Sequence, residues 1–215
     1  MNNQKVMLTG FCRSGTTSIA QFFERFDIPS YHQKLGPGKE NMIPHGILAP
    51  PPWANEYVKK KAAQVRGSWG FESSWEFSHY MYELSLALPD VQWLILVRPP
   101  YHACNSLKAH NRRDDPIDKL AGLYIEVYKS LISQIESMKR RPMWLDFHRY
   151  ISGRYVEPLF ALFDIPRCDA TMRLAHDHLT KKIRTAGEYK MHDSELFPEG
   201  FDLLKRLTWS CRELI

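Results

Sequence analysis

The sequence predicts an α/β fold, a single three-layer domain with a central parallel β-sheet flanked by helices. Segments with a strand pattern alternate along the chain with segments of helical periodicity, as they do in βαβ units. Residues 91–97 form a near-continuous apolar run, which is typical of a central strand in a parallel sheet. The chain has 215 residues, of which 44% are hydrophobic, so it is long enough to bury one core. We therefore expect residues 1–215 to form one domain.

The first half of the chain contains an irregular segment between its first two predicted strands. Residues 5–9 form a short apolar run that predicts a strand, and residues 16–26 carry apolar side chains at helical spacing. Residues 29–53 are rich in proline and glycine, which predicts a loop. A helix over 54–64 and a strand over 68–71 follow. A loop of this length inside a domain is commonly functional.

The second half continues the alternation. A helix is predicted over residues 75–88, where Pro89 ends it, and the strong strand at 91–97 follows. That strand stops at an Arg-Pro-Pro sequence, residues 98–100. The further expected elements are a helix at 101–109, a charged loop at 111–116, a helix at 117–139, a strand at 143–147 and a helix at 155–163.

Charge and cysteine content restrict the ligands and the compartment. Lys plus Arg exceed Asp plus Glu by 29 − 24 = 5, which suits an anionic ligand without identifying it. The aromatic side chains are not arranged as a stacking platform for nucleic acid. The four cysteines are widely spread, without metal-ligand spacing, so we expect neither disulfides nor a bound metal. The N-terminal apolar segment is too short and too polar for a signal peptide or membrane span, so we expect a cytoplasmic protein.

A glycine-bounded turn lies between the first predicted strand and the first predicted helix. Its sequence, GFCRSGTT at residues 10–17, allows backbone N–H groups and the helix N-terminus to bind a phosphate. The loop of ATP and GTP hydrolases requires lysine after the second glycine, and here that position is Thr16. The cation of the turn is instead Arg13. A simpler alternative is that Gly10 and Gly15 only shape a strand-to-helix turn.

The sequence RSGTT of this turn resembles the phosphosulfate loop of the sulfotransferases that use 3′-phosphoadenosine 5′-phosphosulfate (PAPS). The resemblance implies a P-loop-type fold, and it covers about residues 5–190. It also implies that Arg13 stabilises the charge that develops on the leaving phosphate. The expected PAPS-binding residues of the turn are Arg13, Ser14, Gly15, Thr16, Thr17 and Ser18.

A second motif follows the strongest predicted strand. Arg98 ends the strand and Ser106 lies eight residues later, which resembles the 3′-phosphate motif of the same family. The resemblance implies that both side chains bind the 3′-phosphate that distinguishes PAPS from ATP, and a bidentate guanidinium suits that group. The alternative is an arginine that only caps a strand edge.

Transfer to a hydroxyl requires a base near the transferring sulfur, and Glu72 is the first candidate. The segment FESS, residues 71–74, resembles the Glu-Lys-Ser/Thr segment of the carbohydrate sulfotransferases, with Ser73 in place of the lysine. His79 is a rival, because the cytosolic family members use a histidine near the same strand end. Glu72 is alternatively a carboxylate that stabilises the dipole of the helix beginning near Trp75.

A late basic segment, residues 181–187, is a candidate for the family's loop that closes over the nucleotide. In this interpretation Lys182 and Arg184 contact PAPS. A solvated basic turn is the alternative.

Together these motifs predict a sulfotransferase that moves a sulfuryl group from PAPS to a hydroxyl or amine, leaving adenosine 3′,5′-bisphosphate. The acceptor is a small molecule, carbohydrate or lipid, and residues 29–66 and 108–118 are expected to shape its pocket. His32 and His45, in the irregular segment, either meet the acceptor or are surface residues.

Two other functions stay open at this point. A kinase or nucleotide hydrolase is favoured by Asp146, which could bind magnesium, and is opposed by Thr16 in the lysine position. A non-catalytic nucleotide-binding protein with the same fold is the second.

Overall fold

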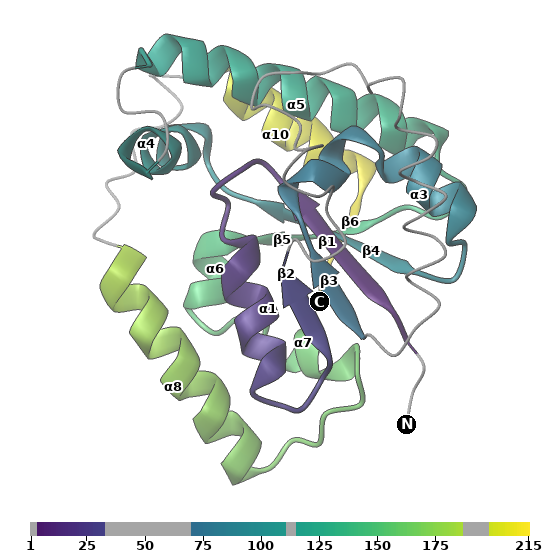
Figure 1. The fold of residues 1–215 in the computed structure, drawn as a ribbon, viewed down its shortest axis with the longest axis vertical. Helices are drawn as coiled ribbons and strands as arrows, with labels where there is room; N and C mark the ends of the chain where they lie inside the picture. Colours follow the sequence, from purple (N-terminus) through teal and green to yellow (C-terminus); the bar gives the residue numbers. More distant parts are fainter. Residues whose placement is uncertain (1–3, 33–69, 111–114, 187–197) are drawn as a thin grey trace.

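The computed structural model of the chain describes residues 4–32, 70–110, 115–186 and 198–215. A sheet of six parallel strands in the order β2-β3-β1-β4-β5-β6 lies at the centre, with helices on both faces (Figure 1). This confirms the predicted α/β class and the three-layer arrangement. The strands are β1 (Val6–Gly10), β2 (Ser30–His32), β3 (Phe71–Ser73), β4 (Gln92–Val97), β5 (Met143–Asp146) and β6 (Arg212–Glu213).

The side chains of the central strands supply two separate cores. Val6 and Leu8 of β1 pack in the core on one face, and Met7 packs in the core on the other. Strand β4 is buried along its whole length, as its apolar sequence predicts. These strands are apolar at most positions because both faces of the sheet are covered.

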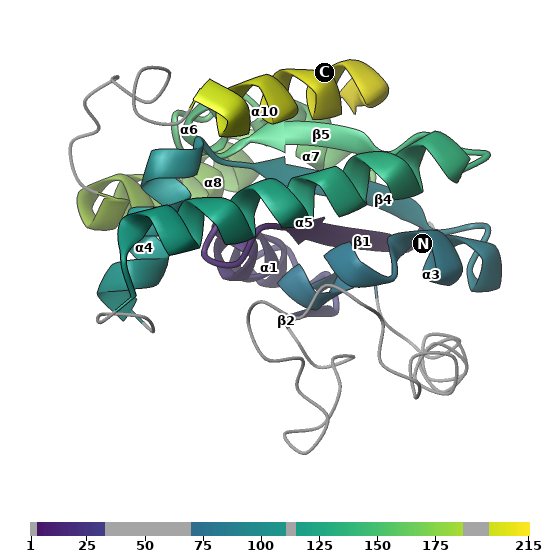
Figure 2. The ribbon, with the colours of Figure 1, turned by 90° about the horizontal axis from the view of Figure 1, so that it is seen from above.

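The helices divide between the two faces of the sheet, as Figures 1 and 2 show. One face carries α1 (Thr16–Glu24), α6 (Phe147–Ile151), α7 (Val156–Ala161) and α8 (Asp169–Ala186). The other face carries a 3-10 helix η2 (Trp75–His79), α3 (Met81–Ala87), α4 (Pro100–His110), α5 (Ile117–Ser137) and α10 (Pro198–Ser210). We refer to these as the α1 face and the α5 face.

Helix α5 is the longest helix and organises its layer. Its buried stripe packs against α3, α4 and α10. Within it Tyr124 and Tyr128, four residues apart, stack with ring centroids 4.3 Å apart.

Several sequence predictions are wrong in detail, for identifiable reasons. Residues 30–32, expected to be irregular, form the edge strand β2 because they pair with β3. Strand β3 includes Glu72 and Ser73 because it is hydrogen-bonded on both sides, to β1 and β2. The helix predicted over 75–88 is two pieces, since the backbone leaves helical geometry at Tyr80 (φ −136°, ψ 20°).

Most of the helices and strands in the C-terminal third of the chain were not predicted from the sequence. Elements α6, α8, α10 and β6 were not foreseen. The basic segment at 181–187, expected to be a loop, belongs to helix α8 as far as residue 186. The helix predicted over 54–64 and His45 lie outside the described residues.

Candidate active site

The candidate site lies where the order of the strands reverses. The chain leaves β1 toward β2 and β3 on one side, whereas β4 leads to β5 and β6 on the other. In open α/β sheets, ligands bind at such a point, outside the carboxyl ends of the strands. The turn after β1 and the Arg98 motif after β4 meet here, because these two strands are neighbours.

The turn after β1 has the backbone geometry of an anion cradle. Arg13 and Gly15 both adopt left-handed conformations, with φ of 67° and 104°. Gly15 is the N-cap of α1 and supplies no side-chain cap, so the first-turn N–H groups keep their donor capacity for a ligand. A Cβ atom at Gly15 would overlap the ring of Phe147, which packs directly against the turn.

Arg98 connects the two predicted phosphate motifs. It is buried, with 7% of its surface exposed, and its Nη1 donates a hydrogen bond of 2.8 Å to the carbonyl oxygen of Arg13. Its guanidinium carbon lies 4.7 Å from the centre of the Phe147 ring. Its own carbonyl accepts a 2.9 Å hydrogen bond from the hydroxyl of Tyr124. The guanidinium is therefore held in one place beside the turn.

The residues of the turn lie in different environments. The Oγ of Ser14 is fully buried and makes no hydrogen bond with any described residue. A buried hydroxyl in that state is costly, and a phosphate ligand would satisfy it. Thr17 is exposed and Thr16 is buried. Ser18 faces away from the turn, since its Oγ lies 3.4 Å from both the hydroxyl of Tyr150 and Nε2 of His178.

Glu72 and Ser73 point to opposite faces of the sheet. Glu72 is fully buried and pairs in register with Met7, whose side chain packs in the core of the α5 face. Ser73 lies on the α1 face, where its Oγ donates a 3.2 Å hydrogen bond to the carbonyl of Thr16. Ser73 therefore contacts the turn after β1, and Glu72 lies on the opposite face of β3.

His32 lies beside Ser73, in a place that the sequence did not reveal. Its Nδ1 is 3.0 Å from Ser73 Oγ. Burial lowers the pKa of His32, a hydrogen bond with the backbone of Ser73 raises it, and the positive charge of Arg13 lowers it. His32 was assigned to an irregular segment because three residues of edge strand carry no periodic signal. The rival His79 is buried in η2, its ring edge-on to that of Trp75 at 5.6 Å.

Two further histidines flank Arg98, and sequence reasoning missed both. The rings of His102 in α4 and His148 in α6 lie 5.3 Å apart. Burial, then the charges of His148 and Arg98, lower the pKa of His102 to about 4. Burial also lowers the pKa of His148, which Asp146 raises and Arg98 lowers. Each histidine follows the carboxyl end of a predicted strand, but only the structure shows that these two strands, β4 and β5, are adjacent.

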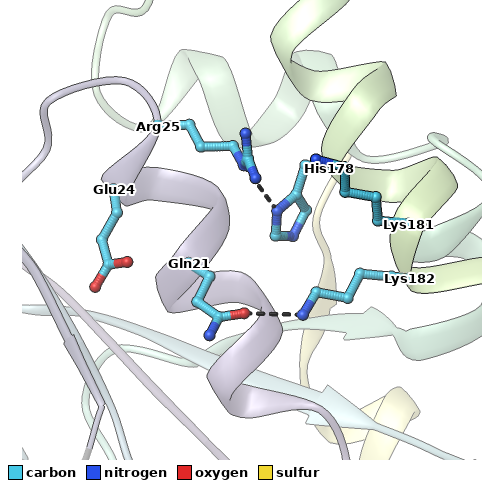
Figure 3. A pocket seen from close by; sticks show the side chains of 6 residues that line it. All are labelled: Gln21, Glu24, Arg25, His178, Lys181 and Lys182. Carbon is cyan, nitrogen blue, oxygen red and sulfur yellow. Dashed lines mark hydrogen bonds between the residues drawn. The ribbon is translucent and has the colours of Figure 1, made fainter. Parts of the chain in front are cut away.

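The remaining predicted contacts are less central. Ser106 lies in the second turn of α4 and is partly exposed. Lys182 Nζ donates a 2.8 Å hydrogen bond to Oε1 of Gln21, between α8 and α1 (Figure 3). The side chain of Arg184 lies outside the part of the chain that the structure describes. Among the described residues there is no group of three possible metal ligands, and none of the described helices is long and apolar enough to cross a membrane.

The fold is similar to that of a solved sulfotransferase domain. A solved structure that the chain resembles is the sulfotransferase domain from the curacin biosynthetic pathway, with a TM-score of 0.58 and 11% sequence identity. The match covers 95% of this chain and 97% of that chain. No family model matches the sequence, and no curated protein matches it. At this identity the likeness concerns the fold.

We expect Gly15→Ala to destabilise the folded protein by about 1–3 kcal/mol, because alanine strains a backbone at φ 104° and its methyl group meets Phe147. Urea unfolding measures the change. Gly122→Ala is the control, since Gly122 lies in α5 with nothing within 4 Å of its added Cβ. That variant should be neutral or stabilising, as alanine favours helix. Equal effects of the two variants would contradict the account of the turn.

We expect His102 to stay neutral in the folded protein until the pH approaches 4, whereas an unfolded histidine titrates near its ordinary value of 6.5. The unfolded chain then binds more protons between these values, so the free energy of unfolding falls as the pH is lowered from 6.5 toward 4. NMR titration of the imidazole gives the pKa. His102→Asn should flatten the dependence of the unfolding free energy on pH, and a midpoint near 6.5 in the folded protein would refute the assignment.

Proposed function

We propose that the protein is a PAPS-dependent sulfotransferase that transfers a sulfuryl group to a hydroxyl or amine of a small-molecule, carbohydrate or lipid acceptor. The observation that carries the proposal is the hydrogen bond from Arg98 to the carbonyl of Arg13. This bond holds a second cation, Arg98, beside the turn at residues 10–17, which lacks the lysine of nucleotide hydrolases. Two anionic groups of one ligand can therefore be bound side by side.

The residues present fit both anionic ends of PAPS. The first-turn N–H groups of α1 and the buried hydroxyl of Ser14 suit the phosphosulfate. Arg98 suits the 3′-phosphate, together with Ser106. Thr16, Thr17 and Ser18 complete the predicted turn, although the Ser18 hydroxyl faces α6 and α8. Contacts from Lys182 and Arg184 stay predictions of the sequence.

The reaction we propose is an in-line displacement at sulfur. The bond between the acceptor oxygen and sulfur forms while the bond from sulfur to the bridging phosphate oxygen breaks. The base takes the proton of the acceptor, and adenosine 3′,5′-bisphosphate leaves. Arg13 stabilises the charge that develops on the leaving phosphate, and the fixed turn orients the reacting groups.

Glu72 is the proposed base, on the strength of its sequence context. The structure adds His32 as a second candidate, because it is partly exposed, lies on the face of the phosphate turn and has a lowered pKa. A neutral imidazole can accept a proton at neutral pH.

The likeness in fold to a sulfotransferase domain supports the proposal. The kinase alternative depends on Asp146, whose carboxylate caps α6 by accepting a 2.9 Å hydrogen bond from the N–H of Arg149. That contact gives Asp146 a structural role, which weakens the argument that it binds magnesium.

We expect Arg98→Gln to reduce the preference for adenosine 3′,5′-bisphosphate over adenosine 5′-phosphate by about 10- to 100-fold, the loss of one or two charge-assisted hydrogen bonds. Calorimetric titration of both nucleotides measures the ratio, which is insensitive to a general loosening of the turn. Arg140→Gln, at an exposed arginine after α5, is the matched control and should leave the ratio unchanged. Tight magnesium-dependent ATP binding without bisphosphate binding would refute the proposed function.

We expect Glu72→Gln to lower kcat for PAPS-dependent transfer at least 100-fold, as loss of a general base does, while bisphosphate affinity changes little. Product nucleotide release across a panel of hydroxyl and amine acceptors measures turnover. Glu76→Gln is the control, because Glu76 is another buried carboxyl in the next segment. The parallel variant His32→Asn decides between the bases. A large loss in His32→Asn with none in Glu72→Gln assigns the role to His32, and no turnover by the unmodified protein with any acceptor favours a non-catalytic binding protein.

A further inference from the structure

We propose that a cavity between helices α1 and α8 is a second anion-binding site, for a ligand that carries a phosphate or sulfate group. The cavity has a volume of about 500 Å³, which is within the range of small-molecule sites. Six residues line it: Gln21, Glu24, Arg25, His178, Lys181 and Lys182. Figure 3 shows that Arg25, His178 and the two lysines extend into the space between the helices.

A buried histidine positions the arginine of this cavity. Nε of Arg25 donates a 3.2 Å hydrogen bond to Nδ1 of His178, a residue with only 2% of its surface exposed. Nδ1 is therefore the acceptor, and the ring proton lies on Nε2, where it faces the oxygens of Ser18 and Tyr150. This bond uses one edge of the guanidinium and fixes its plane, so the terminal N–H groups remain for a ligand.

The lysine side is also held in place. Nζ of Lys182 donates a 2.8 Å hydrogen bond to Oε1 of Gln21, across the gap between the two helices (Figure 3). Glu24 is the one carboxylate among the lining residues, and its side chain is turned away from His178 and the lysines (Figure 3).

The electrostatic field in the cavity is positive. Burial, together with the charges of Lys182, Arg25 and Lys181, lowers the pKa of His178 to about 4. Three cations therefore converge on a neutral imidazole, and an oxyanion bound among them would reduce their mutual repulsion. Arginine with lysine is a donor set that suits the oxygens of phosphate and sulfate groups.

The cavity is separate from the phosphate turn. The turn precedes the N-terminus of α1, whereas Gln21 and Arg25 lie in its C-terminal half and at its end. The proposal does not rest on the proposed function. The alternative interpretation is that Lys182 contacts PAPS, as the sequence predicts, in which case the cavity is part of the nucleotide site.

The test follows the His178 imidazole by NMR while inorganic pyrophosphate is added at constant ionic strength. We expect a saturable shift of this resonance in the unmodified protein and in Arg13→Gln, which lacks the cation of the turn. Arg25→Gln and Lys182→Gln should each weaken the binding about tenfold. Arg173→Gln, on the same helix but outside the cavity, is the matched control and should bind as the unmodified protein does.

Four results would overturn the proposal. The first is the absence of a saturable shift, and the second is loss of the shift in Arg13→Gln, which would place the anion at the turn. The third is equal weakening in Arg173→Gln, which would indicate general charge attraction. The fourth is that adenosine 3′,5′-bisphosphate shifts His178 and loses about tenfold in affinity in Lys182→Gln, which would assign the cavity to the nucleotide site.

Discussion

The candidate site depends on the hydrogen bond between the Arg98 guanidinium and the Arg13 carbonyl. The two residues are 85 positions apart, and they meet because β1 and β4 are adjacent parallel strands whose carboxyl ends share one edge. A buried guanidinium must have acceptors, and the left-handed Arg13 supplies one. The ring of Phe147 packs against both Gly15 and Arg98. The turn and the strand end therefore form one rigid unit.

The alternation of side chains along β3 determines which residues can reach that unit. Ser73 contacts the turn through the carbonyl of Thr16, and His32 joins it from the neighbouring edge strand. Glu72, one residue earlier, faces the α5 side of the sheet. A base at Glu72 would approach the transferring group from one face and a base at His32 from the other. The two mechanisms thus differ in where the acceptor lies, as well as in the residue that takes the proton.

The sequence was informative where structure is encoded locally. The apolar run of β4 and the glycine-bounded turn before α1 each carry a signal within a few residues, and the structure confirms both elements. Strands β2 and β6, of three and two residues, exist only because neighbouring strands pair with them. For the same reason His32 could not be placed. The two histidines beside Arg98 require knowledge that β4 and β5 are neighbours, which the sequence does not state.

Burial and the charges of the site both lower the pKa of its histidines. Arg13 and Arg98 are guanidiniums, which keep their charge at any pH at which the protein is folded. Burial lowers the pKa of His32, His102 and His148 most; the charge of Arg13 lowers that of His32 further, and the charge of Arg98 lowers those of His102 and His148. An anion bound between the arginines would offset these charges and raise those pKa values, because it stabilises each imidazolium. Binding of an anionic donor at Arg13 would then make His32 a stronger proton acceptor, because it would offset the charge that lowers the pKa of His32.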